Sequence, residues 1–268
     1  MNKTVLITGC SSGIGRATAK YFQFHGWDVI ATMRSPEKEK ELLKLPNVIC
    51  PKLDVTKPTT IKSAIKEGIE KFGKIDVIVN NAGYPLYGPF EASTIEQIRQ
   101  QFEVNVFGCI NVMKEMVPYF RKARHGTIIN VTSLGGRITF PLFSVYHSTK
   151  FALEGLSEAM RYELRPFRVK IKMIEPGAVK TNFYSKSMET VTLKEYNHYM
   201  KKVSGLIGVA DDFGVPPEHV AKTIFDAAND NSFKQRYIVG ILASWLLFSR
   251  KYLPDGVYNF IVRSQTEN

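Results

Sequence analysis

Short apolar runs alternate with longer helical stretches along most of this chain of 268 residues, and this alternation limits the folds that it can adopt. Runs rich in Val, Ile and Leu predict strands over 5–8, 28–31, 48–50, 77–80, 127–131, 170–174 and 237–239. Helical patterns between them predict helices over 14–25, 60–72, 94–122, 148–164 and 217–228. Strand and helix therefore follow one another in a regular order.

Several of the predicted strands are apolar throughout, as parallel strands are when helices cover both of their faces. The alternation predicts a doubly wound parallel α/β sheet of about seven strands, with right-handed crossovers and helices on both faces. No linker or internal repeat divides the sequence, so residues 1–268 are expected to form a single domain. Two segments depart from the alternation. Residues 183–215 are expected to be a substrate lid, and residues 241–268 a C-terminal extension.

The first predicted strand leads into Thr8-Gly9-Cys10-Ser11-Ser12-Gly13-Ile14-Gly15, and a predicted helix follows. Glycines let the backbone approach a pyrophosphate at a helix N-terminus, where amide N–H groups lack partners. The spacing is G-x-x-x-G-x-G, but the strand–loop–helix context favours a dinucleotide site over an ordinary turn and indicates a Rossmann-type sheet. The expected cofactor contacts here are Gly9, Ser11, Ser12, Gly13, Ile14 and Gly15.

The end of the second predicted strand indicates which dinucleotide binds. NAD sites place an acidic residue there, about 20 residues on, to accept a hydrogen bond from the ribose 2′-hydroxyl. This strand ends Ala31-Thr32-Met33-Arg34, with no acid between Val29 and Pro36. An acid would repel the 2′-phosphate of NADP, whereas an arginine pairs with it. Arg34 therefore predicts NADP(H) in preference to NAD(H), unless it is only an exposed loop residue.

The segment Tyr146-His147-Ser148-Thr149-Lys150 carries the predicted chemistry. Residues four apart share a helix face, so the phenol of Tyr146 and the ammonium of Lys150 can meet. A nearby cation stabilises a phenolate and lowers the pKa of a tyrosine, which is about 10 when free. Ser133 ends a predicted strand and can donate a hydrogen bond to a substrate oxygen beside Tyr146. His147 faces away from this pair and is expected to pack.

In their order along the chain, these motifs resemble the classical short-chain dehydrogenases/reductases, and the resemblance covers residues 3–181. Asn105, within Val104-Asn105-Val106-Phe107-Gly108, matches the family's catalytic asparagine, and Ser133, Tyr146 and Lys150 match the other three catalytic residues. The resemblance adds expected cofactor contacts at Asp54 and Val55 near the adenine, at Asn81, Ala82 and Gly83 behind the cofactor, and at Pro176, Gly177, Val179 and Thr181 around the nicotinamide carboxamide.

The resemblance also implies roles for these residues. Tyr146 is the general acid/base, and Lys150 binds the nicotinamide ribose and lowers the pKa of Tyr146. Ser133 polarises the carbonyl, and Asn105 holds a water that links Lys150 to bulk solvent. The implied activity is interconversion of a carbonyl and an alcohol on an apolar ketone or aldehyde that is steroid-, retinoid- or lipid-like. The segments 146–155 and 53–56 resemble the 17β-hydroxysteroid and retinol dehydrogenase subgroup.

Two other classes of protein share parts of this pattern. A redox sensor that binds NADP(H) without turnover uses the same fold, but it has no need of all four catalytic residues. A sugar-nucleotide epimerase shares Tyr-x-x-x-Lys, but it has G-x-x-G-x-x-G and a longer C-terminal domain. Some NADP-preferring relatives carry a basic residue where this chain has Ser12, so Arg34 serves without it. Arg16 either reaches the phosphates or faces solvent.

Net charge and cysteine content indicate which partners, metal sites and cellular location to expect. The net charge of +11 comes without a basic stripe interleaved with aromatics, so nucleic acid is not an expected partner, and an anionic cofactor accounts for part of the excess. Three cysteines, an odd number without metal-like spacing, predict no disulfide framework and no metal site. With no signal pattern at the N-terminus, the expected location is cytoplasmic.

The family resemblance also implies a homodimer or homotetramer. The contact helices would be 94–122 and 148–164, whose apolar residues for this contact are Phe102, Val106, Ile110, Phe151, Leu156 and Met160. In the lid, Phe183, Tyr184, Met188, Tyr196, Tyr199 and Met200 either line a bulky apolar ligand or pack on the sheet. Arg250 and Lys251, beside Trp245-Leu246-Leu247-Phe248, support a further expectation that the C-terminus touches a membrane or shields the partner's site.

Overall fold

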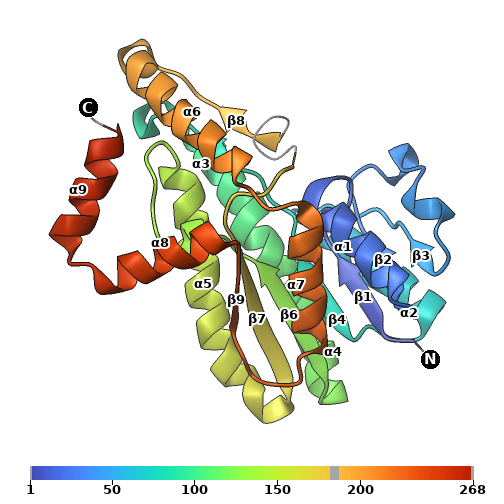
Figure 1. Cartoon of the computed structure of the whole chain (residues 1–268). Helices are drawn as coiled ribbons and strands as arrows, with labels where there is room; N and C mark the ends of the chain where they lie inside the picture. The colour runs from blue at the N-terminus through green and yellow to red at the C-terminus, as the bar shows by residue number, and fades with distance from the viewer. Residues whose placement is uncertain (1, 182–186, 267–268) are drawn as a thin grey trace.

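The computed structural model describes residues 2–181 and 187–266, and its centre is a seven-stranded parallel sheet (Figure 1). The strand order is β3-β2-β1-β4-β6-β7-β9, which confirms the doubly wound α/β prediction. The order reverses after β1, so the cleft between β1 and β4 lies where ligands bind in such sheets. The strands are β1 (Thr4–Ile7), β2 (Asp28–Ala31), β3 (Val48–Ile49), β4 (Val77–Asn80), β6 (Gly126–Val131), β7 (Val169–Pro176) and β9 (Arg236–Val239).

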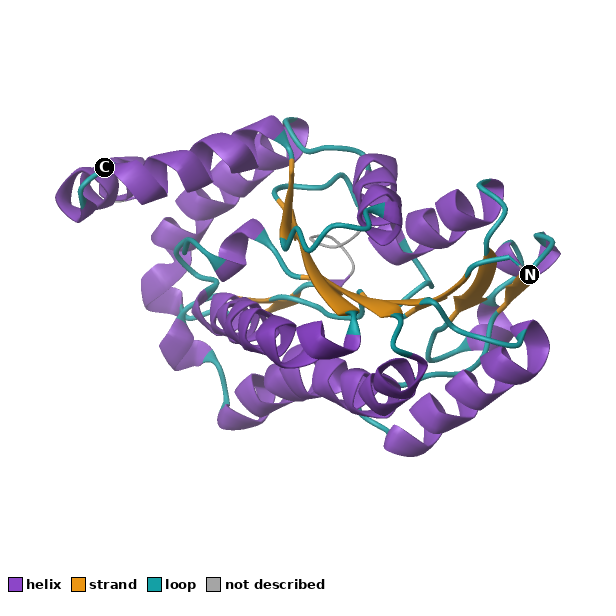
Figure 2. Ribbon diagram, turned by 90° about the horizontal axis from the view of Figure 1, so that it is seen from below, coloured by secondary structure: helices purple, strands orange, loops and turns teal. Residues whose placement is uncertain are grey.

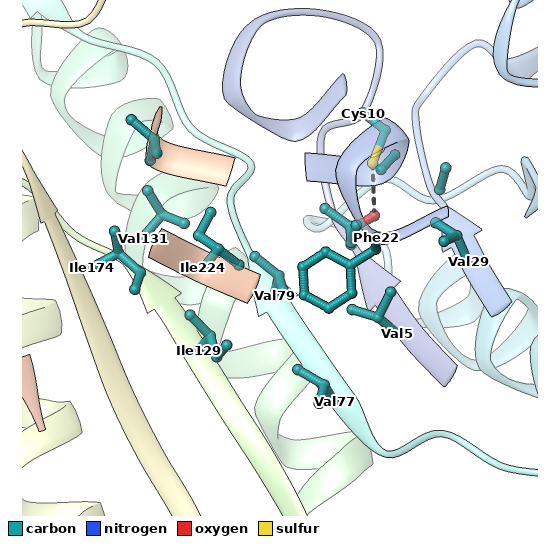
Figure 3. Packing of buried hydrophobic residues seen from close by; sticks show 14 of the residues in the cluster. Val5, Cys10, Phe22, Val29, Val77, Val79, Ile129, Val131, Ile174 and Ile224 are labelled. Atoms are coloured by element: carbon teal, nitrogen blue, oxygen red, sulfur yellow. Dashed lines mark hydrogen bonds between the residues drawn. The ribbon is translucent and has the colours of Figure 1, made fainter. Parts of the chain in front are cut away.

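Helices cover both faces of this sheet, as Figure 2 shows from below. Alternate residues of β1 separate the two cores: Val5 and Ile7 pack with Phe22 and Ile224, whereas Leu6 packs on the other face with Met116. Figure 3 shows the first core, with Phe22 lying across β1 and β4. The first face is covered by α1 (Gly13–Phe24) and α7 (Pro217–Asn229), and the second by α2 (Pro58–Phe72), α4 (Gly108–Ala123) and α5 (Ser144–Leu164).

Two of the predicted helices differ from the structure in ways that affect the site. The predicted helix 94–122 is interrupted: α3 (Ile95–Phe102) passes through a π-helical turn, Glu103–Phe107, before α4 begins. Thr94 starts α3 with a capping box, because its hydroxyl accepts from the Gln97 amide and the Gln97 side chain accepts from the Thr94 amide. The helix predicted to begin at residue 148 begins at Ser144, so both Tyr146 and Lys150 lie on α5.

Segments outside the sheet gather at the carboxyl ends of the strands. The lid contains β8 (Glu189–Thr190), which pairs with β5 (Leu86–Tyr87), and then α6 (Asn197–Asp212). The C-terminal extension consists of α8 (Ile241–Tyr252) and α9 (Asp255–Thr266). Single 3-10 turns complete the structure at Pro36–Lys38, Leu42–Lys44, Phe90–Ala92, Leu134–Gly136, Arg165–Phe167 and Lys194–Tyr196.

Cysteines, possible metal ligands and long apolar helices can be described for residues 2–181 and 187–266. Cys10, Cys50 and Cys109 are all buried and carry free thiols. No group of three or more metal-ligating side chains is found among these residues. In the same part of the chain, every helix is too short or too polar to span a bilayer.

Candidate active site

The loop between β1 and α1 forms a cradle that side chains would fill. A Cβ at Gly15 would lie 2.3 Å from the Gly9 carbonyl oxygen, and Gly9 itself has a φ of +74°. The Ser12 side chain makes no capping hydrogen bond at the start of α1, and the first turn of α1 holds no acidic residue. The first amide N–H groups of α1 are thus free to bind an anion, and the loop fits the pyrophosphate of a dinucleotide.

Thr8 and Asn81 fasten this loop to the end of β4. The Thr8 hydroxyl accepts hydrogen bonds from the amides of Asn81 and Ala82, each at 3.0 Å. The Asn81 side-chain amide donates to the carbonyls of Thr8, at 2.9 Å, and Gly9, at 3.2 Å. These hydrogen bonds give Asn81 a structural role: they fix the glycine loop to the end of β4, at the point where the strand order of the sheet reverses.

Arg34 lies exposed at the end of β2 and lines the same cavity as the glycine loop. Asp54 stands nearby: burial opposes the shift, but hydrogen bonds from Thr56 and the charges of Lys57 and Arg34 hold the pKa of its carboxyl below the usual value. Arg16 pairs with Glu39 and, at 2.8 Å, with Glu41, so its guanidinium is directed to these carboxylates. Of the two arginines considered for the cofactor, Arg34 lines the cavity and Arg16 does not.

Tyr146 and Lys150 meet as the i, i+4 spacing predicts. The Lys150 ammonium lies 5.7 Å from the centre of the Tyr146 ring and donates to the Val131 carbonyl at 3.0 Å. Both residues are buried, and burial lowers the pKa of Lys150 to about 8. Ser133 begins the short turn after β6, and its hydroxyl oxygen accepts from the Gly135 amide at 3.0 Å. The hydroxyl hydrogen of Ser133 therefore has no role in that bond.

His147 packs beneath this group rather than joining it. Its Nδ1 faces the Phe140 amide at 3.2 Å, and its ring lies close to Gly135. Only 4% of the residue is exposed, and burial lowers the pKa of its imidazole to about 4. A neutral His147 thus supports the Ser133 turn from α5.

Asn105 occupies the π-helical turn and is buried. Its side-chain oxygen accepts from the Tyr84 amide at 3.0 Å, and its side-chain nitrogen donates to the Tyr84 carbonyl at 2.9 Å and to the Thr149 hydroxyl at 3.2 Å. The π-turn widens the helix at this position, a feature that often accompanies functional sites. Asn105 thereby connects the segment after β4 to α5, and its bound water stays a prediction.

The turn after β7 closes the far side of the cradle. A Cβ at Gly13 would lie 3.6 Å from Thr181, so this turn faces the glycine loop across the cofactor cleft. The turn is held in place by Val215, whose amide donates to the Ala178 carbonyl at 3.1 Å. Thr181 ends the described part of this segment, because residues 182–186 lie outside the described residues.

A cavity of about 690 Å³ connects these parts. Of the residues that the sequence singled out, Gly15 and Asn105 do not line it, and the structure places them behind its wall. Those that line it are Gly9, Ser11, Ser12, Gly13, Ile14, Arg34, Asp54, Val55, Asn81, Ala82, Gly83, Ser133, Tyr146, Lys150, Pro176, Gly177, Val179 and Thr181. Met188, one of the lid residues offered for an apolar ligand, also lines it. Lining residues that sequence reasoning did not propose as site residues are Met33, Leu53, Thr56, Tyr84, Gln100, Val104, Val131, Thr132, Ser187 and Glu189.

Tyr84 and Glu189 give the cavity a polar edge. The Glu189 carboxylate accepts from the Gln97 side chain at 2.7 Å, and burial together with this carboxylate raises the pKa of Tyr84 to about 12. Tyr84 directly follows the 80–83 motif, which is the signal that could have found it. Glu189 comes from a two-residue strand that pairs about a hundred residues back, at Leu86, and no local pattern indicates it.

Comparison with known proteins agrees with this geometry. The family model for short chain dehydrogenases matches residues 3–192. An uncharacterized oxidoreductase of Schizosaccharomyces pombe is 40% identical, over 82% of this chain and 93% of its own length. The 3-ketodihydrosphingosine reductase of Bacteroides thetaiotaomicron is 33% identical, over 97% of this chain and 96% of its own length.

Solved structures show the same fold. A short-chain dehydrogenase from Streptomyces avermitilis superimposes with a TM-score of 0.85 at 32% identity, covering 98% of this chain and 96% of its own. The protein ElxO, solved with NADP bound, gives a TM-score of 0.76 at 31% identity, covering 90% and 97%. The chain therefore belongs to the short chain dehydrogenase family, whose members are oxidoreductases that act on CH–OH groups with NAD(P)⁺ as acceptor.

Proposed function

We propose that this protein interconverts a carbonyl and an alcohol with NADP(H), and that Tyr146 is the acid/base. The observation that carries the proposal is the meeting of Tyr146, Lys150 and Ser133 in the cavity that the glycine cradle opens. Bound NADP(H) would supply the hydride. The four predicted catalytic residues come from three segments: the π-turn carries Asn105, the turn after β6 begins with Ser133, and α5 carries both Tyr146 and Lys150.

The residues of the chain divide the remaining work. In the direction of reduction, Tyr146 donates its phenolic proton to the substrate oxygen as the carbonyl carbon gains the hydride. Ser133 donates a hydrogen bond to the same oxygen and orients it. The Lys150 ammonium, held by the Val131 carbonyl, stabilises the phenolate that results. In oxidation the same groups act in reverse, with Tyr146 as phenolate.

The preference for NADP(H) over NAD(H) rests on Arg34. The end of β2 exposes this guanidinium beside the cavity and presents no carboxylate in the stretch 30–35. Asp54, which lines the same cavity, accepts two hydrogen bonds from Thr56. ElxO, a structural neighbour, was solved with NADP, which supports the proposal by similarity.

The substrate that we propose is an apolar ketone or aldehyde, with long-chain keto lipids as the first class to test. Tyr87, Leu142 and Phe143 form a buried cluster with Tyr146, and the lid adds Met200. Met188, Tyr196 and Tyr199 pack against this cluster rather than on the main sheet, whereas Phe183 and Tyr184 lie outside the described residues. The name of the bacterial reductase above, which acts on 3-ketodihydrosphingosine, supports a lipid. Steroid- or retinoid-like substrates of the subgroup named earlier are the runner-up.

We further propose that residues 183–215 act as the lid and that the protein forms a homodimer or homotetramer. Val106, which the sequence offered for the contact, lies in the π-turn and is buried within the subunit. Phe107 is 48% exposed in its place, and Phe151 of α5 is 44% exposed. Phe102, Ile110, Leu156 and Met160, also offered for the contact, are half-buried. Such an assembly would cover Phe107 and Phe151 together with the exposed parts of these four side chains. A cytoplasmic location is part of the same proposal.

A substrate panel tests the function. Purified protein is mixed with NADPH and with ketones and aldehydes of increasing chain length, steroids and retinoids, and the loss of NADPH absorbance is followed. We expect turnover with the apolar members, rising with apolar length. NADPH binding without turnover on any member would instead support the non-catalytic NADP(H) sensor.

A further inference from the structure

Helix α8 carries apolar side chains on two opposite faces. Residues 241, 245, 248 and 252 are spaced by four, three and four, so they form one stripe along the helix. This stripe is Ile241, Trp245, Phe248 and Tyr252, and their exposed fractions are 88%, 70%, 63% and 61%. In α9, Phe260 is 72% exposed. We call these five residues the outer stripe.

The opposite face of α8 is anchored in the protein. Ala243 and Leu247 are buried against Leu134 and Ile138, which follow Ser133 in the chain. The helix is therefore held in one orientation, and that orientation directs the outer stripe to solvent. Figures 1 and 2 both show α8 and α9 extending outward from the sheet and its covering helices. An apolar surface of this size on an anchored helix is the mark of a contact with something outside the subunit.

Basic side chains accompany the outer stripe. Residues 241–266 contain Arg250, Lys251 and Arg263 against the single acid Asp255, and Glu267 follows beyond the described part. The Lys251 ammonium lies 5.0 Å from the centre of the Tyr252 ring, and Arg250 pairs with Asp255 at 2.5 Å. Exposed Trp, Phe and Tyr beside Lys and Arg are the composition of helices that lie in a membrane interface.

We infer that α8 and α9 dock this protein on an anionic lipid surface through the outer stripe. The whole chain carries a net charge of +11, which adds long-range attraction to such a surface. A symmetric contact of this face with a second copy would instead gather the basic residues of both copies in one interface. Charge thus favours lipid as the occupant. This inference is independent of the substrate proposed above.

The docked position would bring the cavity toward the lipid. A Cβ at Gly177 would lie 3.0 Å from the Ala243 side chain, so the start of α8 rests on the turn that lines the cavity. At its other end, the extension reaches the lid, because α9 contacts α6. The proposed docking surface is thereby joined to the turn that lines the cavity and to the lid.

The two tryptophans allow a direct test. Trp27 is 5% exposed and lies far from α8 in sequence, whereas Trp245 belongs to the outer stripe. A Trp27→Phe variant therefore reports Trp245 alone. Mixed with vesicles of phosphatidylcholine and phosphatidylglycerol, its emission should shift to the blue, and lipids that carry a quencher in the acyl chain should quench it. Added salt or vesicles of phosphatidylcholine alone should weaken both effects.

A matched pair of triple variants identifies the surface. Trp245→Ser, Phe248→Ser and Phe260→Ser together should lower vesicle co-sedimentation by ~10-fold or more. The control carries Phe24→Ser, Phe90→Ser and Tyr162→Ser, which are exposed to a similar extent elsewhere, at 83%, 65% and 58%. It should bind vesicles like the wild type. Both should keep a native circular dichroism spectrum and NADPH affinity.

Three results would overturn the inference. Wild-type protein that stays in the supernatant with anionic vesicles at low salt would do so, as would equal losses in the two triple variants. Light scattering that shows a wild-type dimer and a monomeric Trp245/Phe248/Phe260 variant, with no vesicle binding by the wild type, would assign the outer stripe to a second copy.

Discussion

Helices α1 and α8 each follow a strand of the main sheet at the end where the cavity lies, but they use their apolar residues differently. Helix α1 buries Ala19 and Phe22 against the sheet, and α7 covers its flank. Helix α8 buries Ala243 and Leu247 and still exposes the four aromatic and aliphatic side chains on its other face. The inner face of each helix is explained by the fold, whereas the outer face of α8 is not.

This difference separates two kinds of constraint in one molecule. Around α1, close backbone approach decides which residues fit, so substitutions there should damage folding and cofactor binding together. Around α8 and α9, the subunit leaves space, so substitutions there should alter contacts with other molecules and little else.

Glycine substitutions give the largest expected contrast. In Gly15→Ala, the new Cβ would lie 2.3 Å from the Gly9 carbonyl oxygen and 2.6 Å from the Asn81 side-chain nitrogen. We expect the free energy of unfolding to fall by ~3 kcal/mol and NADPH binding to weaken sharply, because the cradle must open. Urea unfolding and NADPH fluorescence titration measure both effects.

Gly256→Ala in α9 is the matched control. A Cβ there meets no atom within 4 Å, and alanine favours a helix over glycine. Its stability should stay the same or rise by up to ~1 kcal/mol, with unchanged NADPH affinity. Similar losses in both variants would mean that the two regions are constrained alike.

The loss of stability at low pH should come from a buried residue near the cavity, His147. Burial lowers the pKa of His147 to about 4, whereas a histidine in the unfolded chain has a pKa of about 6.5. Between these two pH values, the imidazole is therefore neutral in the folded protein and protonated in the unfolded chain. The neutral His147 therefore makes its full contribution to the free energy of unfolding above pH ~6.5. This contribution, about 2–3 kcal/mol, is lost as the pH falls toward 4. His147→Asn keeps an acceptor for the Phe140 amide and removes the titration.

Urea unfolding of the two proteins at pH 7 and at pH 4.5 checks this prediction. The wild type should lose clearly more stability between these values than His147→Asn does. Parallel losses would show that His147 does not control the acid sensitivity.

A smaller effect is expected at the end of β2. Wild-type kcat/KM should be higher with NADPH than with NADH, and Met33→Asp with Arg34→Ala should change that ratio by ~10–100-fold toward NADH. The single variant Arg16→Ala is the control and should keep the wild-type ratio, because Arg16 already pairs with Glu39 and Glu41. A wild type that uses NADH as well as NADPH would contradict the role given to Arg34.

Much of the sheet and of the candidate active site could be predicted from the sequence, because the patterns that indicate them are local. The glycine loop, the apolar strands and the Tyr146–Lys150 spacing each depend on residues within one short segment. The start of α5 at Ser144 and the π-turn around Asn105 were missed, since both depend on how neighbouring segments pack.

Long-range contacts explain the remaining differences. The two-residue strands β5 and β8 exist only through pairing across about a hundred residues, and they bring Glu189 to the cavity. The pairing of Arg16 with Glu39 also depends on a distant loop. The exposed stripe of α8 was visible only as an apolar run, because which side of a helix faces the protein is decided by the fold.

The central claim is that Tyr146 exchanges the proton with the substrate oxygen, and Tyr146→Phe tests it most directly. The variant keeps the ring and its packing with Phe143 but lacks the hydroxyl. With a substrate found in the panel, we predict that NADPH binds with wild-type affinity while kcat falls by ~10²–10⁴-fold. NADPH titration and steady-state rates on the two proteins are sufficient. Near wild-type turnover by Tyr146→Phe would contradict the account, and the proton would then have to come from another group.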